Sequence, residues 1–327
     1  MKSITHITDL DTMRRTSSVY AVVCAWAHRG LFEALSEGPR ALRELPGDER
    51  ALDVAARILG HLGLLVGHGD RWGLSVTGKR LFDEGALSLG SGLRAFRDLA
   101  GLDRVLAEGG PARGDDGSSR ASEGGVREQD PDEARQFMDM LYRRSADSAP
   151  ETVRWMTPHL APSAHVLDVG GGHGRYAEHL LQAGFRATVL DRPVCIALAR
   201  ARYGDRLGYL EADFLVDPLD GPYDAALLSN IVHGLGPDEI VTLLRNLHRS
   251  MAPGALLVIK DMLLDESRVQ PEAGVVFALT MLLFTRKGNS YDRSQLETYL
   301  TEAGFHREAV VDVTDQRFSL MLARRTG

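Results

Sequence analysis

The sequence predicts an α/β protein in which a mostly parallel, seven-stranded sheet follows a mainly helical N-terminal part. The length of 327 residues is enough for roughly two domains. From Ala164 onward, short β-branched and Leu-rich runs alternate with helical runs, a pattern typical of a parallel sheet. Residues 1–108 instead carry Ala, Leu and Arg at helical spacing, which predicts helices there.

The seven predicted strands follow one another at short intervals. They read HVLDVG, ATVLD, GYLEADF, YDAALLSNI, ALLVIKD, REAVVDV and FSLMLAR. Only a short turn containing TDQ separates the last two. We therefore expect the last strand to run antiparallel to its neighbours.

A polar stretch separates the two parts. Residues 109–130 read GGPARGDDGSSRASEGGVREQD and contain almost no apolar side chain, so we expect a flexible loop. Helical spacing returns over residues 131–160, which we predict to be a linker helix. We expect a helical domain over residues 1–155 and an α/β domain over residues 156–327.

Residues 20–82 are similar to a winged helix, a unit that often binds DNA. Short helices near 21–35, 40–45 and 50–65 precede two strand-like pieces joined by GHGD. The region has 8 Lys and Arg against 7 Asp and Glu, and its last helix has only Arg50 and Arg57 as basic side chains. DNA recognition needs several basic side chains aimed at phosphates. We expect this helix to be buried, against its own domain or a second subunit, and keep a DNA-binding regulator as the less favoured alternative.

Charge and cysteine usage exclude several classes of protein. The net charge of −7 argues against a partner in nucleic acid or membrane, since both attract a basic face. Neither Ala21–Ala27 nor Val275–Phe284 approaches the roughly 18–20 residues that span a bilayer. Cys24 and Cys195 form no CxxC pair, and the 11 His show no HExxH spacing, so we expect no metal site. The acidic N-terminus MKSITHITDLD is unlike a signal peptide, which predicts a cytoplasmic protein.

The most informative segment is residues 164–181, AHVLDVGGGHGRYAEHLL. A strand leads into a glycine-rich turn and then a helix. Gly170 and Gly172 allow the backbone to approach a ligand closely, and such turns bind nucleotides in doubly wound sheets. The dinucleotide pattern GxGxxG fails here, because its third glycine would fall on Arg175.

Acidic residues lie at the ends of the first three α/β strands. Asp168 is beside the turn, where a carboxylate repels a pyrophosphate but attracts the ammonium and sulfonium groups of S-adenosylmethionine. Asp191 ends the second strand and can accept both ribose hydroxyls, as it would in an NAD enzyme. Asp213 and Phe214 end the third strand and suit the edge and face of an adenine; a polar cap and a core ring are the alternative interpretation.

These motifs, in this order, resemble those of the S-adenosylmethionine-dependent small-molecule O-methyltransferases. The segments that carry the resemblance are DVGGGHG, VLDRP, EADF, SNIVHGLGPDE and LTEAGF, and the plant caffeate-type and bacterial natural-product enzymes are the most similar group. The resemblance covers the whole α/β half and implies a Rossmann-like methyltransferase sheet. The N-terminal half is similar to the winged-helix-like dimerisation domain of that family, which implies a homodimer.

The resemblance implies where the cofactor lies. S-Adenosylmethionine would rest on Gly170 and Gly172, with Asp191 at its ribose. The remaining cofactor residues would be Arg192, Asp213 and Phe214 near the adenine, and Ser229, where many members carry a longer side chain.

The resemblance also implies the catalytic residues. His233 falls at the position of the general base, just past the fourth strand, and histidine suits proton removal at neutral pH. Asp261 matches an acidic residue that orients the histidine, and Asp292 matches a second one. Most other help to the reaction would come from positioning.

One motif departs from the family pattern. Members usually have His-Asp-Trp at the catalytic turn, whereas this chain has His233, Gly234 and Leu235. Without the Asp and Trp side chains, the sequence does not show which residues hold the catalytic turn in place. The departure also keeps a second chemistry open, since relatives with this fold and cofactor perform C- or N-methylation, decarboxylation, hydroxylation or pericyclic reactions.

Two apolar helical faces are implied to line the acceptor pocket, although core packing is the usual reason for such faces. Asn230, a polar residue at the end of the fourth strand, is predicted to bind the acceptor as well. The full set of predicted acceptor-binding residues is Phe137, Met138, Tyr142, Asn230, Phe277 and Met281. They imply a flat, largely apolar acceptor such as a phenol or a polyketide-like aromatic.

Overall fold

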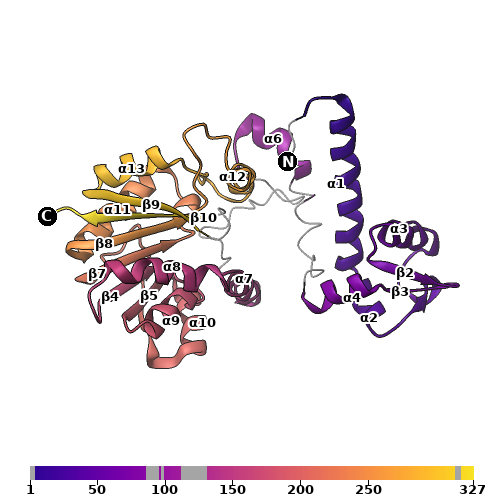
Figure 1. Ribbon diagram of the computed structural model, residues 1–327, viewed down its shortest axis with the longest axis horizontal. Coiled ribbons are helices and arrows are strands. Elements are labelled where there is room, and N and C mark those ends of the chain that lie inside the picture. The colour runs from indigo at the N-terminus through magenta and orange to yellow at the C-terminus, as the bar shows by residue number, and fades with distance from the viewer. Residues whose placement is uncertain (1–3, 86–95, 97–98, 112–130, 314–317) are drawn as a thin grey trace. The chain divides into compact units, whose positions relative to one another are not determined.

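The computed structural model describes residues 4–85, 96, 99–111, 131–313 and 318–327 (Figure 1). The chain divides into two compact units, Met1–Asp103 and Arg104–Gly327. The predicted domain boundary at residue 155 was drawn from the start of the α/β pattern, and it stays a prediction. Most of the predicted loop over residues 109–130 lies outside the described residues.

The first unit is mainly helical, as predicted. Its elements are α1 (Ile7–His28), α2 (Leu31–Ser36), β1 (Arg40–Ala41), α3 (Glu49–His61), β2 (Leu65–His68), β3 (Arg71–Leu74) and α4 (Val76–Asp83). The three strands form a small antiparallel sheet in the order β1-β3-β2. The helix predicted over residues 21–35 is interrupted, because Gly30 has a left-handed φ of 67° between α1 and α2.

Helix α3, the helix that would recognise DNA in a winged helix, buries one face against its own unit. Leu52, Ala56 and Leu59 lie on that face and are at most 5% exposed, as expected for residues that recur every three or four positions. On the same helix, Arg57 is paired with Asp53 at 2.7 Å. Of the two basic side chains on this helix, Arg57 is therefore already neutralised by Asp53, which further disfavours binding to DNA phosphates.

The second unit contains one sheet of seven strands. They are β4 (His165–Val169), β5 (Arg186–Asp191), β6 (Gly208–Glu211), β7 (Tyr223–Ser229), β8 (Met251–Asp261), β9 (Phe305–Val313) and β10 (Phe318–Arg325). Their order is β6-β5-β4-β7-β8-β10-β9. The first five pair in parallel, and β10 is antiparallel to both β8 and β9. The predicted sheet, including its antiparallel last strand, is confirmed.

Helices cover both faces of this sheet (Figure 1). One face packs against α8 (Ser148–Met156), α9 (Arg175–Gln182) and α10 (Pro193–Tyr203). The other packs against α11 (Pro237–Ser250) and α13 (Arg293–Glu302). Because both faces are buried there, the central strands β4, β5, β7 and β8 carry continuous buried runs rather than alternating ones.

Helix α6 (Leu102–Glu108) begins at the boundary between the units, and α7 (Pro131–Arg144) and α12 (Glu272–Phe284) belong to the second unit. The segment predicted as one linker helix over residues 131–160 is divided, since α7 ends at Arg144 and α8 begins at Ser148. The Ser145 hydroxyl donates to the Tyr142 carbonyl at 2.9 Å where α7 ends. Within the described parts of the chain, we find no helix with the length and apolar character needed to cross a bilayer.

The α3 packing predicts different costs for two substitutions on one helix. Leu59→Ala should lower the free energy of unfolding by about 2–5 kcal/mol, because Leu59 is fully buried. Val54→Ala, at a position 46% exposed, should change it by less than about 1 kcal/mol. Urea unfolding of the full chain, followed by circular dichroism, measures both. Equal losses would contradict the assignment of the buried face.

Candidate active site

The carboxyl ends of five parallel strands, β4 to β8, meet at one edge of the sheet. Ligands bind at this edge in doubly wound proteins. The edge brings together the glycine turn after β4, Asp191 at the end of β5 and Ser229 at the end of β7, and Asp261 ends β8 there as well. The structure thus gathers predicted residues that are up to 93 positions apart (Asp168 to Asp261: 261 − 168 = 93).

The turn after β4 is built from backbone that has no room for side chains. Gly170 has φ 64° and Gly172 has φ 39°. A Cβ added to Gly170 would lie 2.3 Å from the Ile231 side chain, and one added to Gly172 would lie 2.9 Å from the Met138 sulfur. The sequence requires glycine here because the left-handed backbone and the close packing both exclude a Cβ.

Asp191 ties the end of β5 to this turn. Its carboxylate accepts from the Gly172 amide at 2.8 Å and from the Arg192 amide at 2.8 Å. Burial raises the pKa of Asp191, while these two backbone bonds act in the opposite direction. The Asp191 side chain therefore lies against the turn. A residue that contacts a ligand bound at the turn needs this position.

Asp168 is a buried carboxylate with almost nothing to neutralise it. It is 1% exposed, and neither carboxylate oxygen receives a well-formed hydrogen bond from the described residues. Burial raises its pKa to about 7; the nearby Ala177 amide lowers it and the charge of Asp191 raises it further. A buried unpaired carboxylate is costly, so this site suits a cationic group from outside the protein.

Asp213 and Phe214 lie just beyond the third α/β strand rather than in it, since β6 ends at Glu211. The Asp213 carboxylate accepts from the Leu215 amide at 2.8 Å, so it begins a turn instead of pairing with a strand. The Phe214 carbonyl accepts from the Asn246 side chain on α11 at 2.9 Å. Asn246 thereby holds the loop that carries both predicted adenine contacts.

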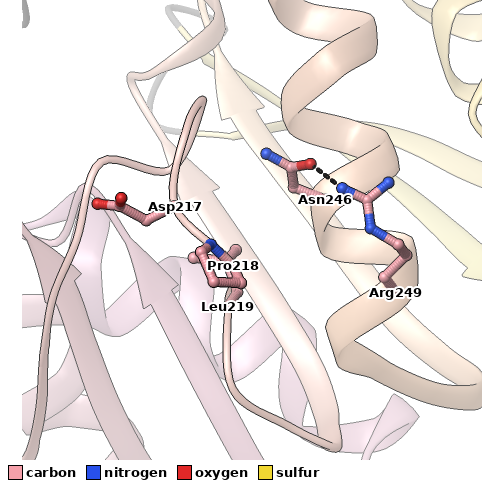
Figure 2. Close-up of a pocket in the computed structure, with 5 residues that line it drawn as sticks. All are labelled: Asp217, Pro218, Leu219, Asn246 and Arg249. Atoms are coloured by element: carbon pink, nitrogen blue, oxygen red, sulfur yellow. Dashed lines mark hydrogen bonds between the residues drawn. The ribbon is translucent and has the colours of Figure 1, made fainter.

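A pocket lies behind this loop (Figure 2). It is lined by Asp217, Pro218, Leu219, Asn246 and Arg249. Arg249 donates to the Asn246 amide oxygen, and this bond leaves the amide nitrogen of Asn246 for the loop. The pocket belongs to the support of the loop and holds none of the predicted catalytic residues.

His233 and Asp261 form a hydrogen-bonded pair at the end of β7 and β8. The His233 Nδ1 lies 2.8 Å from an Asp261 oxygen, and the side chains are 16% and 2% exposed. Burial raises the pKa of Asp261, but His233, the Met262 amide and Lys260 outweigh it, so the net pKa is lowered. The carboxylate is an acceptor, so Nδ1 carries a proton, and in the neutral ring Nε2 then keeps a free electron pair.

Phe277 of α12 lies against this histidine. The two rings are 4.8 Å apart and nearly perpendicular, at 87°. Met281, one turn further along α12, is buried with 8% exposure. The predicted Phe277 therefore does lie beside the predicted base, whereas Met281 sits deeper in the protein.

Asp292 is occupied by other partners. Its carboxylate caps α13 by accepting from the Gln295 amide at 2.8 Å, and it pairs with Arg268 at 2.6 Å. Capping by aspartate stabilises a helix start. Among the described residues, its hydrogen bonds therefore go to α13 and Arg268, and the predicted orienting role stays a prediction.

The three predicted acceptor contacts on α7 have different surroundings. Met138 covers the glycine turn at Gly172, while Phe137 packs with Met138 and Cys195 between α7 and α10. Tyr142 is held between two guanidinium groups, with Arg175 at 4.4 Å and Arg202 at 4.0 Å from the ring centre. Such cation–π contacts fix the ring, so Tyr142 fastens α7 to the sheet unit.

A buried lysine escaped the sequence reasoning. Lys260 is fully buried, lies 3.4 Å from the Phe318 ring centre and 3.4 Å from the Asn230 side-chain oxygen, and pairs in register with Ser229. Burial lowers its pKa to about 7, against the opposing charges of Asp261 and Glu151. A Lys within the apolar strand ALLVIKD was the available signal, since lysine is almost never buried without a partner.

His173, inside the glycine turn, was also missed. Its pKa is lowered to about 4 by burial and by the positive charges of Arg202, Arg175 and Lys260. It therefore stays neutral at physiological pH. Among the described residues, no group of three or more His, Cys, Asp and Glu side chains lies close enough together to hold a metal ion.

Comparison with known proteins agrees with this geometry. The family model of the O-methyltransferase domain matches residues 120–306, more than half of the chain. This chain belongs to that family. The matched segment of this chain includes the glycine turn, Asp191 and the His233–Asp261 pair.

Two curated relatives of this chain are named as O-methyltransferases. The tetracenomycin polyketide synthesis 8-O-methyl transferase TcmO of Streptomyces glaucescens is 26% identical over 54% of this chain and 53% of its own. The phenazine O-methyltransferase PhzM of Lysobacter antibioticus is 31% identical over 50% of this chain and 49% of its own. The matched segments thus span about half the length of these relatives.

Solved structures extend the similarity of fold to both halves. The mitomycin 7-O-methyltransferase MmcR has a TM-score of 0.83 at 22% identity, covering 98% of this chain and 97% of its own. Human N-acetylserotonin methyltransferase, solved in complex with SAM, has a TM-score of 0.76 at 21% identity and covers both chains completely. At these identities the comparison establishes the fold alone.

S-Adenosylhomocysteine is the form of the cofactor that remains after methyl transfer, and we expect the Asp168 carboxylate to bind its ammonium group. The affinity of the protein for S-adenosylhomocysteine should therefore depend on pH. With a pKa of about 7, the carboxyl is mostly ionised at pH 8 and mostly neutral at pH 6, so the affinity should fall by about tenfold on acidification. Isothermal titration calorimetry at both pH values measures this change.

Asp168→Asn is the matched control, because it keeps the shape and removes the titration. Its affinity should be weak and nearly independent of pH between 6 and 8. Lys260 titrates in the same range, so an unchanged pH dependence in Asp168→Asn would assign the effect to Lys260 and refute the prediction for Asp168.

Proposed function

We propose that this protein transfers a methyl group from S-adenosylmethionine to a hydroxyl group of a small aromatic metabolite. The observation that carries the proposal is the His233–Asp261 pair, at 2.8 Å, on the sheet edge that also holds the glycine turn. Membership in the O-methyltransferase family supports the same reaction.

The residues at the turn fit S-adenosylmethionine. Gly170 and Gly172 give the turn its left-handed backbone, and Asp191 lies against the turn by accepting from the Gly172 amide. The unpaired Asp168 suits the ligand's ammonium group. We expect Arg192, Asp213 and Phe214 to border the adenine. When bound, S-adenosylmethionine supplies an electrophilic methyl group.

His233 acts as the general base in this proposal. Asp261 accepts the Nδ1 proton and holds the ring, so Nε2 is the nitrogen that takes the proton from the acceptor hydroxyl. The imidazolium that forms is stabilised by the buried Asp261 carboxylate, whose lowered pKa keeps it ionised. The oxygen left behind is a stronger nucleophile, and the rest of the site aligns it.

An aromatic acceptor fits the surroundings of His233. The Phe277 ring stands edge-on to the histidine at 4.8 Å and offers an apolar surface for a flat molecule. The printed names of relatives point the same way, among them the 3-hydroxy-5-methyl-1-naphthoate 3-O-methyltransferase of Streptomyces sahachiroi. We therefore expect a phenol or a polyketide-like aromatic.

The replacement of His-Asp-Trp by His233, Gly234 and Leu235 favours one second candidate. In it, the same cofactor site serves C- or N-methylation, decarboxylation, hydroxylation or a pericyclic step. Mass spectrometry of the product shows whether one methyl group has been added. Treatment with a reagent that cleaves aryl methyl ethers then removes the methyl group if it is on oxygen and leaves it in place if it is on carbon or nitrogen.

We also propose that the chain forms a homodimer through its N-terminal unit. Helix α1 carries a row of exposed apolar side chains: Ile7 at 84%, Leu10 at 52%, Met13 at 44% and Tyr20 at 48%. Such rows are typical of surfaces that pack against a partner, and a second copy of this chain is the partner that the family resemblance implies.

His233→Ala should reduce kcat by about 10²–10⁴-fold, because it removes the base. The affinity for S-adenosylhomocysteine should stay unchanged, since His233 lies outside the glycine turn. Steady-state kinetics with a panel of small phenols and calorimetry with the cofactor product measure the two quantities. Full turnover in the variant would remove His233 from the mechanism.

The dimer proposal predicts twice the chain mass of 35.8 kDa in light scattering at micromolar concentration. Leu10→Glu should shift the mass towards that of one chain, because it places a charge in the proposed interface. Thr12→Glu on the same helix adds the same charge among polar neighbours and serves as the control. A wild-type mass of one chain would refute the proposal.

A further inference from the structure

The catalytic turn lacks the side chains that usually follow its histidine, yet it is well held. Residues Val232–Gly234 form a single 3₁₀ turn. A Cβ added to Gly234 would meet nothing within 4 Å, so no group of the described residues fills the position of a side chain there. The support of the turn must therefore come from another part of the chain.

That support comes from residues 285–291, which we call the bracing segment. Its Asn289 amide donates to the His233 carbonyl at 2.9 Å. Its Tyr291 hydroxyl donates to the Leu235 carbonyl. The two bonds hold the backbone on both sides of Gly234, while Asp261 holds the ring of His233 at Nδ1.

Gly288 lets the bracing segment come close enough to do this. A Cβ at Gly288 would lie 2.4 Å from the His233 carbonyl oxygen and 3.2 Å from the Gly234 Cα. Both are backbone atoms, which cannot rotate away as a flexible side chain could. Any residue other than glycine at this position must push the turn or the bracing segment out of place.

The bracing segment is itself anchored at several points. Lys287 pairs with Glu239 at 2.8 Å, and Glu239 also accepts from the Gly236 amide at 2.8 Å, directly after the catalytic turn. At the other end, the Ser290 hydroxyl donates to the Gly274 carbonyl at 2.8 Å. The segment can therefore resist displacement of the turn from a fixed position.

We infer that the bracing segment, through Gly288 and Tyr291, positions His233 in place of the missing Asp-Trp pair. Both residues act through the turn and touch neither cofactor nor acceptor in this inference, so they are positioning residues. The consequence for activity rests on the proposed function, whereas the consequence for the His233–Asp261 hydrogen bond does not.

The test compares Gly288→Ala and Tyr291→Phe with the control Gly234→Ala, in which the added methyl group has free space. The main readout is the Nδ1–H proton resonance of His233 in protein labelled with ¹⁵N-histidine, assigned by its loss in His233→Ala. Gly288→Ala should weaken or shift this resonance, because the turn moves away from Asp261. Gly234→Ala should retain it.

Kinetics and cofactor binding provide the second readout. Gly288→Ala should lower kcat by about 100-fold, as expected for misplacement of a catalytic group by about 1 Å, with KM and the affinity for S-adenosylhomocysteine within about threefold. Tyr291→Phe keeps the ring and loses one hydrogen bond, so its kcat should fall by up to about tenfold. A general loss of structure would instead weaken cofactor binding too.

Each outcome decides the inference. An unchanged His233 resonance in both Gly288→Ala and Tyr291→Phe overturns it, as does an equal change in Gly234→Ala. If Gly288→Ala fails to fold, the resonance in Tyr291→Phe decides. If the wild-type protein methylates no phenol, the proposed function fails, and the resonance still tests the role of the bracing segment.

Discussion

The parallel pairing of β5, β4, β7 and β8 is the constraint on which the candidate site depends. Parallel strands end at the same edge, so residues that are far apart in sequence meet there without any special contact between them. Successive side chains on a strand point to opposite faces, and β8 uses this fully. Asp261 points to the face with α11 and orients His233, while Lys260 points to the face with α8 and α9, where Tyr176 lies.

The two faces of this edge differ in how their charges are satisfied. The Asp261 carboxylate has a partner in His233, and its pKa is lowered despite complete burial. On the opposite face, Asp168 receives no well-formed hydrogen bond from the described residues, Lys260 contacts only neutral groups at close range, Asn230 and the Phe318 ring, and burial moves both pKa values to about 7. Buried unpaired charges reduce the stability of the folded protein by several kcal/mol. Their retention beside a glycine turn agrees with a site that gains its counter-charges from a ligand.

Helices and loops outside the sheet hold the segments that surround the strand ends. Asn246 holds the loop that carries Phe214, and the bracing segment holds the turn that carries His233. Tyr142 does the same for α7, between Arg175 and Arg202. In each case the chemistry-bearing residue and its support come from different elements. This division explains how the turn at His233 is held although Gly234 and Leu235 follow the histidine.

The sequence by itself determined the α/β class, the seven strands and the glycine turn, and the family resemblance implied that Asp261 orients His233. These follow from local periodicity and from motifs whose spacing survives in the chain. Only the tertiary structure decided that Tyr142 lies between two arginines, that Asp292 caps α13 and that Gly288 lies against the His233 carbonyl. Such roles depend on which side chains long-range packing brings together. Periodicity indicates only that a residue is buried or exposed, whereas the neighbour it meets is determined by the packing of the whole unit.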